Sequence, residues 1–411
     1  MSDAVEPGRA RSCRRAPHRL PATCVADFNQ PRSSFQLASR SAASANRASF
    51  LTLPSQLKKK TMPLTLNRRV SPMADAVAHI SEFNLSIDSI LTTDSAKARK
   101  DARRVFAMHY ATPARGLATA CDTGAVATTK PRGYLASVAA LADRHGMRAA
   151  VASHNGCKFS TAGCRAGCLA FSGHGGLSVD VASCRARRTL ARLADPVLYA
   201  RAVLLASCRE LARARSLGLP LALRLNGTDE TPWHRLRFSV STADAVAIRS
   251  RYGVDVEIGK SLNIREALAG FNPDVDFYEY LKAPLDGPDG LRAWRAAGWD
   301  VTKSFAADAL TSCPDAIAAA REGFRVAIPV AIPKGQSIPS RVVISCGGDS
   351  VSLQAVDGDT SDARFCDPGA SCAVILRAKR SRGADLAAAS RFILPNQSRV
   401  DLATGSVEFC A

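Results

Sequence analysis

The sequence contains no uninterrupted apolar run of the roughly 18 residues that a membrane-spanning helix needs, so we expect no membrane segment. Aromatic residues are scarce as well, at 6% of the chain. Apolar residues nevertheless make up 46%, which excludes a wholly disordered or fibrous protein. At 411 residues, the chain has room for two or three domains, or for one large α/β domain with a tail. We expect a cytoplasmic protein of unspecified oligomeric state.

Acidic residues are nearly absent from the first 72 positions, which hold 13 Lys and Arg against three Asp and Glu. This segment supplies about half of the net charge of +19 and shows no sustained hydrophobic period. We therefore predict that residues 1–72 form a disordered basic tail. Three explanations fit it: an organelle transit peptide, a nucleic-acid-binding arm, or upstream sequence joined to a true start at Met62 or Met73. We favour the third.

The rest of the chain is predicted to fold. Residues 75–146 suggest a helical and loop region, with helices over 95–110 and 134–145, and residues 396–411 suggest a C-terminal tail. From 147 to 395, strands and helices alternate in about seven units, beginning with a strand over 149–153. Such alternation predicts a parallel sheet with helical crossovers. The fold class is α/β, either a (β/α) repeat forming a partial or closed TIM-barrel-like core, or a doubly wound sheet.

Both architectures gather functional groups at the carboxyl ends of their strands. Four polar clusters hold such positions, and a fifth follows a later strand. They are a cysteine loop, residues 226–230, Lys282, Lys303 with Ser304, and residues 357–359. We expect one shared site.

The cysteine loop carries Cys157, Cys164 and Cys168 in a C-x6-C-x3-C spacing. Thiolates bind soft and borderline metals, so the three suit a [4Fe–4S] cluster with one open iron, or zinc with water, His154 or His174 as fourth ligand. Buried thiols without metal are the alternative. A full disulfide framework is not expected, because the 13 cysteines are an odd number and no secretory signal is visible.

Glycines let the backbone approach a ligand and expose N–H donors, which makes Gly173, Gly175 and Gly176 candidates. Because they lie just downstream of the cysteine triad, we predict that they bind a cofactor.

Catalytic candidates are Asp229, Glu230, Lys282 and Lys303. The two acids suit acid–base work or a cofactor amine, although Asp229 could instead cap the turn before Pro232. The two lysines suit a carboxylate or phosphate, although lysines at strand ends are commonly solvated.

Two later segments also carry charge. Three carboxylates in residues 357–362 suggest Mg²⁺ or Ca²⁺, but we favour a turn that brings Arg364 and Asp367 into an ion pair. The basic run at 377–382 is either a solvated face or a phosphate or nucleic-acid contact.

Several motifs in one order resemble an uncharacterised family carried by phages and plasmids. The resemblance covers roughly residues 110–395, and ordered motifs are more specific than single ones. Its residues include the cysteine triad with Leu169, Ser172-Gly173-x-Gly175, Arg185-x2-Arg188-Thr189, Arg224-x-Asn226-Gly227-Thr228-Asp229, Trp233, Phe277-Tyr278-x-Tyr280-x-Lys282 and the segment from Val356 to Pro368.

A more distant resemblance is to radical S-adenosylmethionine enzymes, in which three thiolates hold a [4Fe–4S] cluster that chelates the cofactor. It implies that Cys157, Cys164 and Cys168 are cluster ligands. It also implies that Asn226, Gly227 and Thr228, with Asp229, take the place of the cofactor-amine motif and bind the cofactor. The spacing departs from the C-x3-C-x2-C usual there.

Together these features predict an iron–sulfur enzyme of phage or mobile-element origin, resembling radical S-adenosylmethionine enzymes, with a small-molecule or nucleotide-like substrate. The alternative is a zinc-stabilised, non-catalytic protein that binds phage or plasmid nucleic acid. The basic charge balance and an arginine-rich helix near residue 187 support that alternative.

Overall fold

The computed structural model describes residues 72–93, 101–113, 132–168, 178–306, 308–309, 311–332, 336–346, 348–369, 371–378, 393, 398–401 and 406–409. All of them belong to one compact unit, Asn67–Ala411. The basic tail predicted for residues 1–72 lies outside the described residues up to position 71. No helix within the described ranges is long and apolar enough to cross a bilayer.

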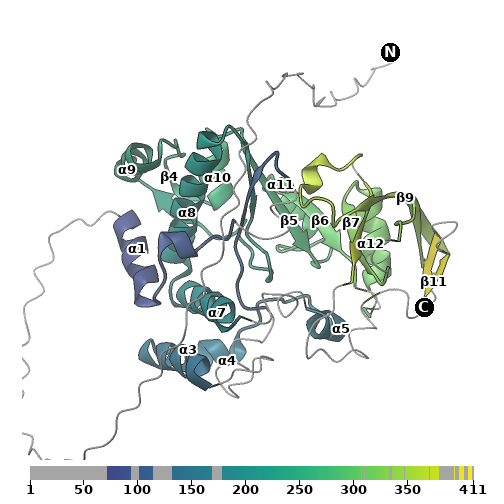
Figure 1. The fold of residues 1–411 in the computed structure, drawn as a ribbon, viewed down its shortest axis with the longest axis horizontal. Helices are drawn as coiled ribbons and strands as arrows, with labels where there is room; N and C mark the ends of the chain where they lie inside the picture. Colours follow the sequence, from purple (N-terminus) through teal and green to yellow (C-terminus); the bar gives the residue numbers. More distant parts are fainter. Residues whose placement is uncertain are drawn as a thin grey trace, which may run out of the picture. The chain divides into compact units, whose positions relative to one another are not determined.

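The elements alternate along much of the chain (Figure 1). The α-helices are α1 (Pro72–Glu82), α3 (Arg132–Arg144), α4 (Arg148–Ser153), α5 (Ala162–Ala166), α7 (Val179–Ala194), α8 (Pro196–Ser216), α9 (Thr242–Tyr252), α10 (Ile264–Ala269), α11 (Leu291–Ala296) and α12 (Ser312–Arg321). Two short 3-10 helices are η1 (Ile87–Ser89) and η4 (Arg364–Cys366). The strands are β1 (Val105–Met108), β2 (Leu221–Arg224), β3 (Phe238–Val240), β4 (Gly259–Leu262), β5 (Val275–Leu281), β6 (Asp300–Ser304), β7 (Arg325–Val330), β8 (Arg341–Cys346), β9 (Asp349–Asp357), β10 (Ala373–Arg377), β11 (Ser398–Asp401) and β12 (Ser406–Phe409).

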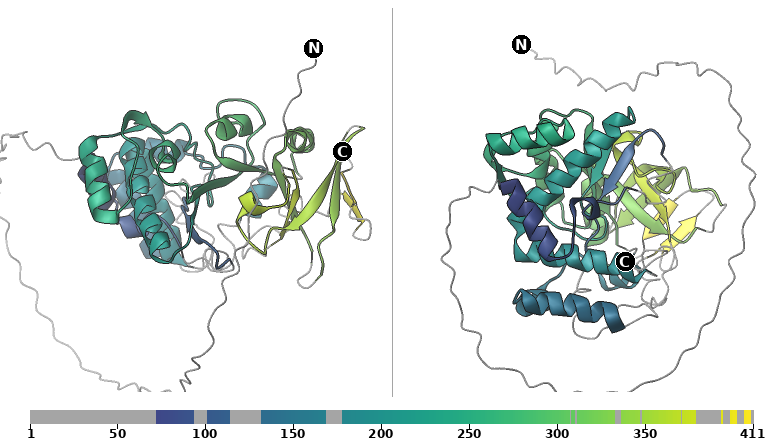
Figure 2. Two further views of the ribbon diagram at one scale, coloured as in Figure 1. Left: turned by 90° about the horizontal axis from the view of Figure 1, so that it is seen from above. Right: turned by 60° about the vertical axis from the view of Figure 1, so that its left-hand side comes forward.

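Ten of the described strands form one sheet in the order β1-β2-β5-β6-β7-β10-β9-β8-β12-β11. The first seven of these run parallel. Strand β8 then pairs antiparallel with β9, and β11 pairs antiparallel with β12. Figure 1 and the two views of Figure 2 show the central strands side by side, with the β8–β12 end beyond them. The chain is therefore a mixed α/β protein with a mostly parallel sheet, as the alternation predicts.

The helices pack on one face of the parallel strands. Side chains that alternate along the strands, such as Ala107, Leu223 and Phe277, belong to the core cluster that includes α1, α7, α8, α10 and α11. Their neighbours on the opposite face, including Phe106 and Tyr278, form a smaller cluster with Phe365 of η4. This alternation follows from the two-residue period of a strand. It leaves the second face for the segment around η4.

The described strands do not close into a barrel. Strand β1 stands at one end of the strand order and β11 at the other, so the sheet is open. The turn to antiparallel pairing at β8 and β9 ends the run of parallel units. A tight β8–β9 connection replaces a helical crossover there, and the pattern needed to continue a closed barrel is lost. The closed form of the predicted barrel is therefore wrong for this part of the chain.

Two local predictions are also wrong. Residues 149–153 lie in helix α4, not in a strand. Alanine is the strongest helix former, and an Ala-rich apolar run of five residues has no period that separates the two states. Residues 105–108 form strand β1, not the end of a basic helix over 95–110. All four β1 residues are buried, which a short apolar run permits in either structure.

Several helix boundaries predicted from capping residues are confirmed. Asp195 divides the long helical stretch into α7 and α8, and Pro196 starts α8. The Asp195 carboxylate accepts hydrogen bonds from the backbone N–H groups of Val197 and Leu198, both at 2.9 Å. Asn263 caps α10 in the same way, with Glu266 completing a capping box. These local rules hold because the side chain satisfies the free N–H groups of its own helix.

Removing the Asp195 cap should destabilise the protein. We expect Asp195→Ala to lower the free energy of unfolding by about 1–2 kcal/mol, because two N–H groups lose their acceptor. Urea unfolding followed by circular dichroism measures this. The exposed Asp180 in the first turn of α7 provides the control, since Ser178 caps that helix. Equal losses for Asp195→Ala and Asp180→Ala would contradict the assignment.

Candidate functional site

One cavity of about 180 Å³ lies at the carboxyl ends of the parallel strands. Strands β2, β5, β6, β7 and β10 each contribute residues from their last positions or from the residues just after them. All five predicted clusters contribute to the lining of this cavity, through the cysteine loop, residues 226–230, Lys282, Ser304 and Asp359. Lys303, predicted together with Ser304, does not line it. The structure thus brings together the groups for which we expect a shared site.

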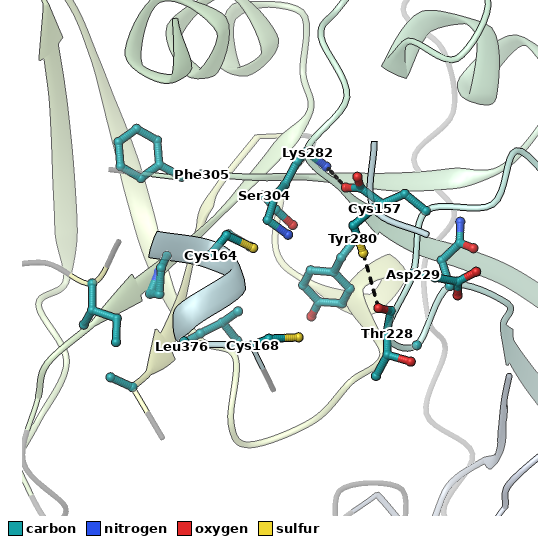
Figure 3. A pocket seen from close by; sticks show the side chains of 18 of the residues that line it. Cys157, Cys164, Cys168, Thr228, Asp229, Tyr280, Lys282, Ser304, Phe305 and Leu376 are labelled. Carbon is teal, nitrogen blue, oxygen red and sulfur yellow. Dashed lines mark hydrogen bonds between the residues drawn. The ribbon is translucent and has the colours of Figure 1, made fainter. Parts of the chain in front are cut away.

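All three cysteines line this cavity (Figure 3). Cys157 precedes helix α5, Cys164 lies within it, and Cys168 follows it. The prediction that this loop directly follows a strand is wrong. The loop comes after α4, in the long connection between β1 and β2. Within the described ranges, no group of three His, Cys, Asp or Glu side chains is close enough to hold a metal ion. The thiols therefore share a cavity wall without standing at ligand spacing.

Two carboxylates hold the cysteine loop against the sheet. Glu230 accepts hydrogen bonds from the backbone N–H of Lys282 at 2.7 Å and of Phe159 at 3.3 Å. Its own backbone N–H donates to the carbonyl of Gly156 at 2.7 Å. Asp308 accepts from the Thr161 hydroxyl at 2.5 Å and from the Gly163 N–H at 2.6 Å. Glu230 and Asp308 therefore fix both ends of the segment that carries Cys157 and Cys164.

Lys282 places a positive charge beside the thiols. Burial disfavours its ammonium, but the charges of Cys164, Glu230 and Cys157 outweigh that effect and raise the pKa of Lys282 above its usual value. The ammonium also forms a hydrogen bond with Cys164. The Lys282 ammonium therefore compensates negative charge on this wall of the cavity.

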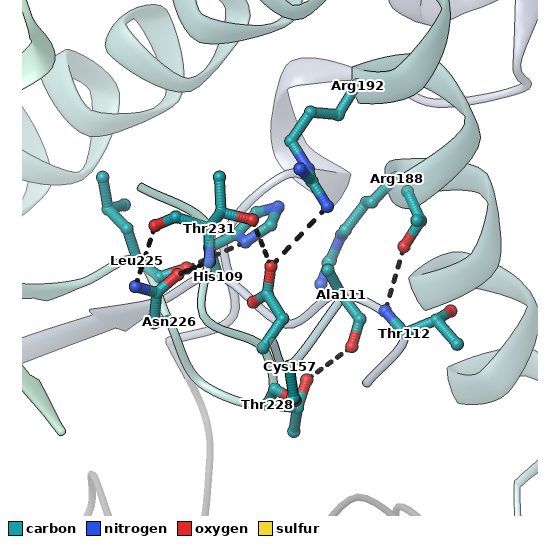
Figure 4. A network of polar contacts seen from close by, with 12 residues as sticks. His109, Ala111, Thr112, Cys157, Arg188, Arg192, Leu225, Asn226, Thr228 and Thr231 are labelled. Carbon is teal, nitrogen blue, oxygen red and sulfur yellow. Dashed lines mark hydrogen bonds and ion pairs between the residues drawn. The ribbon is translucent and has the colours of Figure 1, made fainter. Parts of the chain in front are cut away.

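The Asn226 turn is held by its own side chains (Figure 4). Asn226 accepts from the N–H of Thr231 at 3.0 Å and donates to the carbonyl of the same residue at 3.0 Å. Thr228 donates to the carbonyl of Ala111 at 2.5 Å. Gly227 donates to the carbonyl of His109 at 2.9 Å, and a Cβ there would stand 2.6 Å from that oxygen. The three residues predicted to bind a cofactor thus first serve to seat this turn on the chain after β1.

Asp229 is the acid at this turn with unused bonding capacity. Its Oδ2 accepts from the Thr231 hydroxyl at 2.5 Å and lies 3.8 Å from Arg192, an ion pair too long for a hydrogen bond. Its Oδ1 has no hydrogen-bond partner among the described residues. Burial raises the pKa of Asp229 to about 6, against the opposing charge of Arg192 and the Thr231 hydrogen bond. A carboxyl that titrates near neutrality on a cavity wall is suited to proton transfer.

Other predicted residues lie apart from the cavity or outside the described ranges. Lys303 is buried, donates to the carbonyls of Lys282 and Ala283 at 3.1 and 2.8 Å, and pairs with Asp315 at 3.6 Å. Burial lowers the pKa of Lys303, and its contacts are those of a structural cation. Gly173, Gly175 and Gly176 lie outside the described residues.

The acidic turn after β9 is internally paired. Asp357 pairs with Arg377 at 2.6 Å, and Asp359 accepts from the backbone N–H of Arg377 at 3.0 Å. Arg364 and Asp367 form the predicted ion pair at 3.4 Å. Arg377, the first residue of the basic run, therefore lines the cavity and is paired with Asp357.

Sequence reasoning did not assign a site role to the polar residues of the buried strands. Arg224 stacks over the Tyr280 ring at 4.5 Å and pairs with Asp362 at 3.5 Å. Tyr278 donates to the same aspartate at 3.1 Å. Glu279 accepts from the N–H groups of Leu225 and Asn226 at 2.7 and 3.0 Å. The sequence does contain a signal for these residues, because Arg224 and Glu279 are charged residues within otherwise largely apolar strands.

A model of the family described as Gene product 88 matches residues 116–395, more than half of the chain and nearly the whole region of the first resemblance. The chain belongs to the Gene product 88 family. No curated protein and no solved structure matches it. The family match agrees with the resemblance to an uncharacterised phage-borne family, and it names no chemistry. For this member of the Gene product 88 family, function must therefore be argued from the cavity itself.

Glu279 should make the stability of the protein depend on pH. Burial raises its pKa to about 8, against the hydrogen bonds of Leu225 and Asn226, so the folded chain holds this proton more tightly than the unfolded chain does. The stabilisation from the neutral carboxyl is therefore complete below the unfolded pKa and is lost as the pH rises through about 8. We expect Glu279→Gln to flatten the fall of the unfolding free energy between about pH 5 and pH 8.

Chemical denaturation at a series of pH values measures this effect. Glu82→Gln, which changes an exposed residue of α1, is the matched control and should follow the wild-type profile. A Glu279→Gln profile parallel to wild type would show that this carboxyl is already ionised in the folded state.

Proposed function

We propose that the chain binds a [4Fe–4S] cluster through Cys157, Cys164 and Cys168 and is a radical S-adenosylmethionine-like enzyme. Its proposed substrate is a small molecule or a nucleotide-like compound. The observation that carries the proposal is the convergence of three thiols on one cavity, at the carboxyl ends of parallel strands. A parallel sheet with its helices on one face also supports a partial (β/α) barrel, the finer form of the predicted fold.

The residues present fit a thiolate-bound metal centre in donor chemistry. Three cysteines from one loop reach the cavity, and Lys282 compensates negative charge beside two of them. Their present separation means that the loop must draw together when it binds metal. Metal binding supplies free energy that can order the segment carrying its ligands. When bound, a cluster of this type supplies single electrons for the reduction of S-adenosylmethionine.

The surrounding residues have separate tasks in this proposal. The Glu230 carboxylate holds the cysteine loop against the end of β5. The backbone N–H of Glu230 also bonds to Gly156, which holds the start of that loop against the Asn226 turn. Asp229 offers a carboxyl that can take or give a proton at Oδ1. Phe305, Ala327 and Leu376 give the cavity an apolar side that excludes water from a bound substrate. These features suit a small organic substrate held between the cysteine loop and the sheet.

The zinc and nucleic-acid alternative keeps its basis in charge but receives less support from the arginine-rich helix. Arg188 of α7 donates to the carbonyls of Ser89 and Tyr110, and Arg187 donates to Ser183 and to the Asn84 carbonyl. These guanidinium groups are used within the protein. They are therefore not free to contact phosphates along a nucleic acid.

Metal analysis after anaerobic purification tests the proposal. We expect about four iron and four sulfide per chain and a broad absorption near about 400 nm, as thiolate-ligated clusters show. Single Cys→Ser changes at 157, 164 and 168 should each remove most of the iron. Cys366→Ser is the control, because this exposed cysteine lies outside the cavity and should leave the iron content unchanged.

Two outcomes would overturn the cluster. Stoichiometric zinc without sulfide would favour the alternative, and DNA binding that weakens steeply with salt would then support its nucleic-acid part. Protein that contains no metal, together with unchanged thermal stability of the triple Cys→Ser variant, would show that the thiols only pack.

A further inference from the structure

A second cavity, of about 250 Å³, is lined in part by residues immediately before and after Cys157. Its walls include His154, Lys158, Arg192, Glu230 and Asp289. We propose that it binds a small oxyanion, a carboxylate or a phosphate group, on the guanidinium of Arg192 and the imidazole of His154.

The guanidinium of Arg192 carries the argument. Its Nε and Nη2 atoms are buried and have no hydrogen-bond acceptor among the described residues. These two nitrogens form one edge of the guanidinium, which matches two oxygens of a carboxylate or phosphate. The nearby Asp229 carboxylate stands 3.8 Å from Nη2 and leaves that edge without a hydrogen bond.

Two other arginines of the chain show both nitrogens of this edge in use. Arg188 lies one turn earlier on α7, and its Nε and Nη2 both donate to the carbonyl of Ser89. Arg103 directs the same two nitrogens to the carboxylate of Asp101, each at 2.9 Å. Leaving such donors unmet inside a protein is unfavourable. Arg192 is therefore prepared for an acceptor that comes from outside the chain.

His154 adds a second donor on the same wall. Its Nε2 is buried and also lacks a partner among the described residues. Burial and the charge of Arg192 lower the pKa of His154 to about 4, so the ring is neutral and keeps one N–H. A neutral ring beside Arg192 can donate to an oxyanion without adding charge repulsion toward the guanidinium.

The acids in the wall do not turn the cavity into a cation site. Both oxygens of Glu230 accept backbone N–H groups. Asp289 accepts from Arg235 at 2.8 Å and from Lys158 at 3.4 Å. The Lys158 side chain is 67% exposed, so its ammonium can draw an anion toward the cavity from solvent.

Thermal shift and titration calorimetry test the site on the full chain, with inorganic phosphate and acetate as separate probes and chloride at equal ionic strength as reference. We expect at least one oxyanion to raise the melting temperature saturably, because it binds the folded state alone. Binding of phosphate only, or of acetate only, identifies the group. Equal effects of phosphate, acetate and chloride would overturn the proposal.

Variants locate the binding. We expect Arg192→Gln to raise the dissociation constant at least tenfold and Arg192→Lys to raise it several-fold, since lysine keeps the charge but not the paired donors. His154→Phe tests the cavity without unpairing Asp229 and should weaken binding several-fold. Arg187→Gln is the control, because it removes the same charge from α7 but lies outside the cavity. Wild-type affinity in both Arg192→Gln and His154→Phe would refute the site. These measurements need no iron, so their outcome is independent of the cluster.

Discussion

The parallel run of strands from β1 to β10 is the constraint on which the site depends. Neighbouring parallel strands end at the same edge of a sheet, so residues that follow different strands lie close together there although they are far apart in sequence. Lys282 follows β5, Asn226 follows β2 and Arg377 ends β10, and all three line one cavity. The cysteine loop has no strand of its own. It reaches the same edge because Glu230 and Asp308 tie it to loops that follow other strands.

Several buried ionisable groups lie at or near this edge of the sheet. Asp229, Glu279, Asp362 and Arg224 are each largely removed from water, which costs free energy unless partners compensate. Glu279 and Asp362 are compensated by backbone N–H groups, tyrosine hydroxyls or arginine. Asp229 is compensated only in part. Groups left in that state are common where a protein binds or transforms a ligand, and Asp229 lines the same cavity as the three thiols.

The arginine-rich composition has an internal explanation in this part of the chain. Arginines of α7 hold the backbone carbonyls of Ser89 and Tyr110 and pack over the Tyr110 ring. A guanidinium satisfies several carbonyls at once, which helps to fix long connections such as the one between β1 and β2. Basic composition alone is therefore a weak guide to nucleic-acid binding in this protein.

Local chemistry made some features readable from the sequence. Asp195 and Asn263 marked helix starts because a capping side chain bonds to its own helix, and the cysteine spacing marked a loop that does reach the cavity. The predictions for the short apolar runs 149–153 and 105–108 are wrong, since four or five residues carry no period that separates a helix from a strand. The opening of the sheet, the burial of Asp229 and the unmet edge of Arg192 depend on contacts between distant segments. Such contacts leave no local pattern, and only the packed fold reveals them.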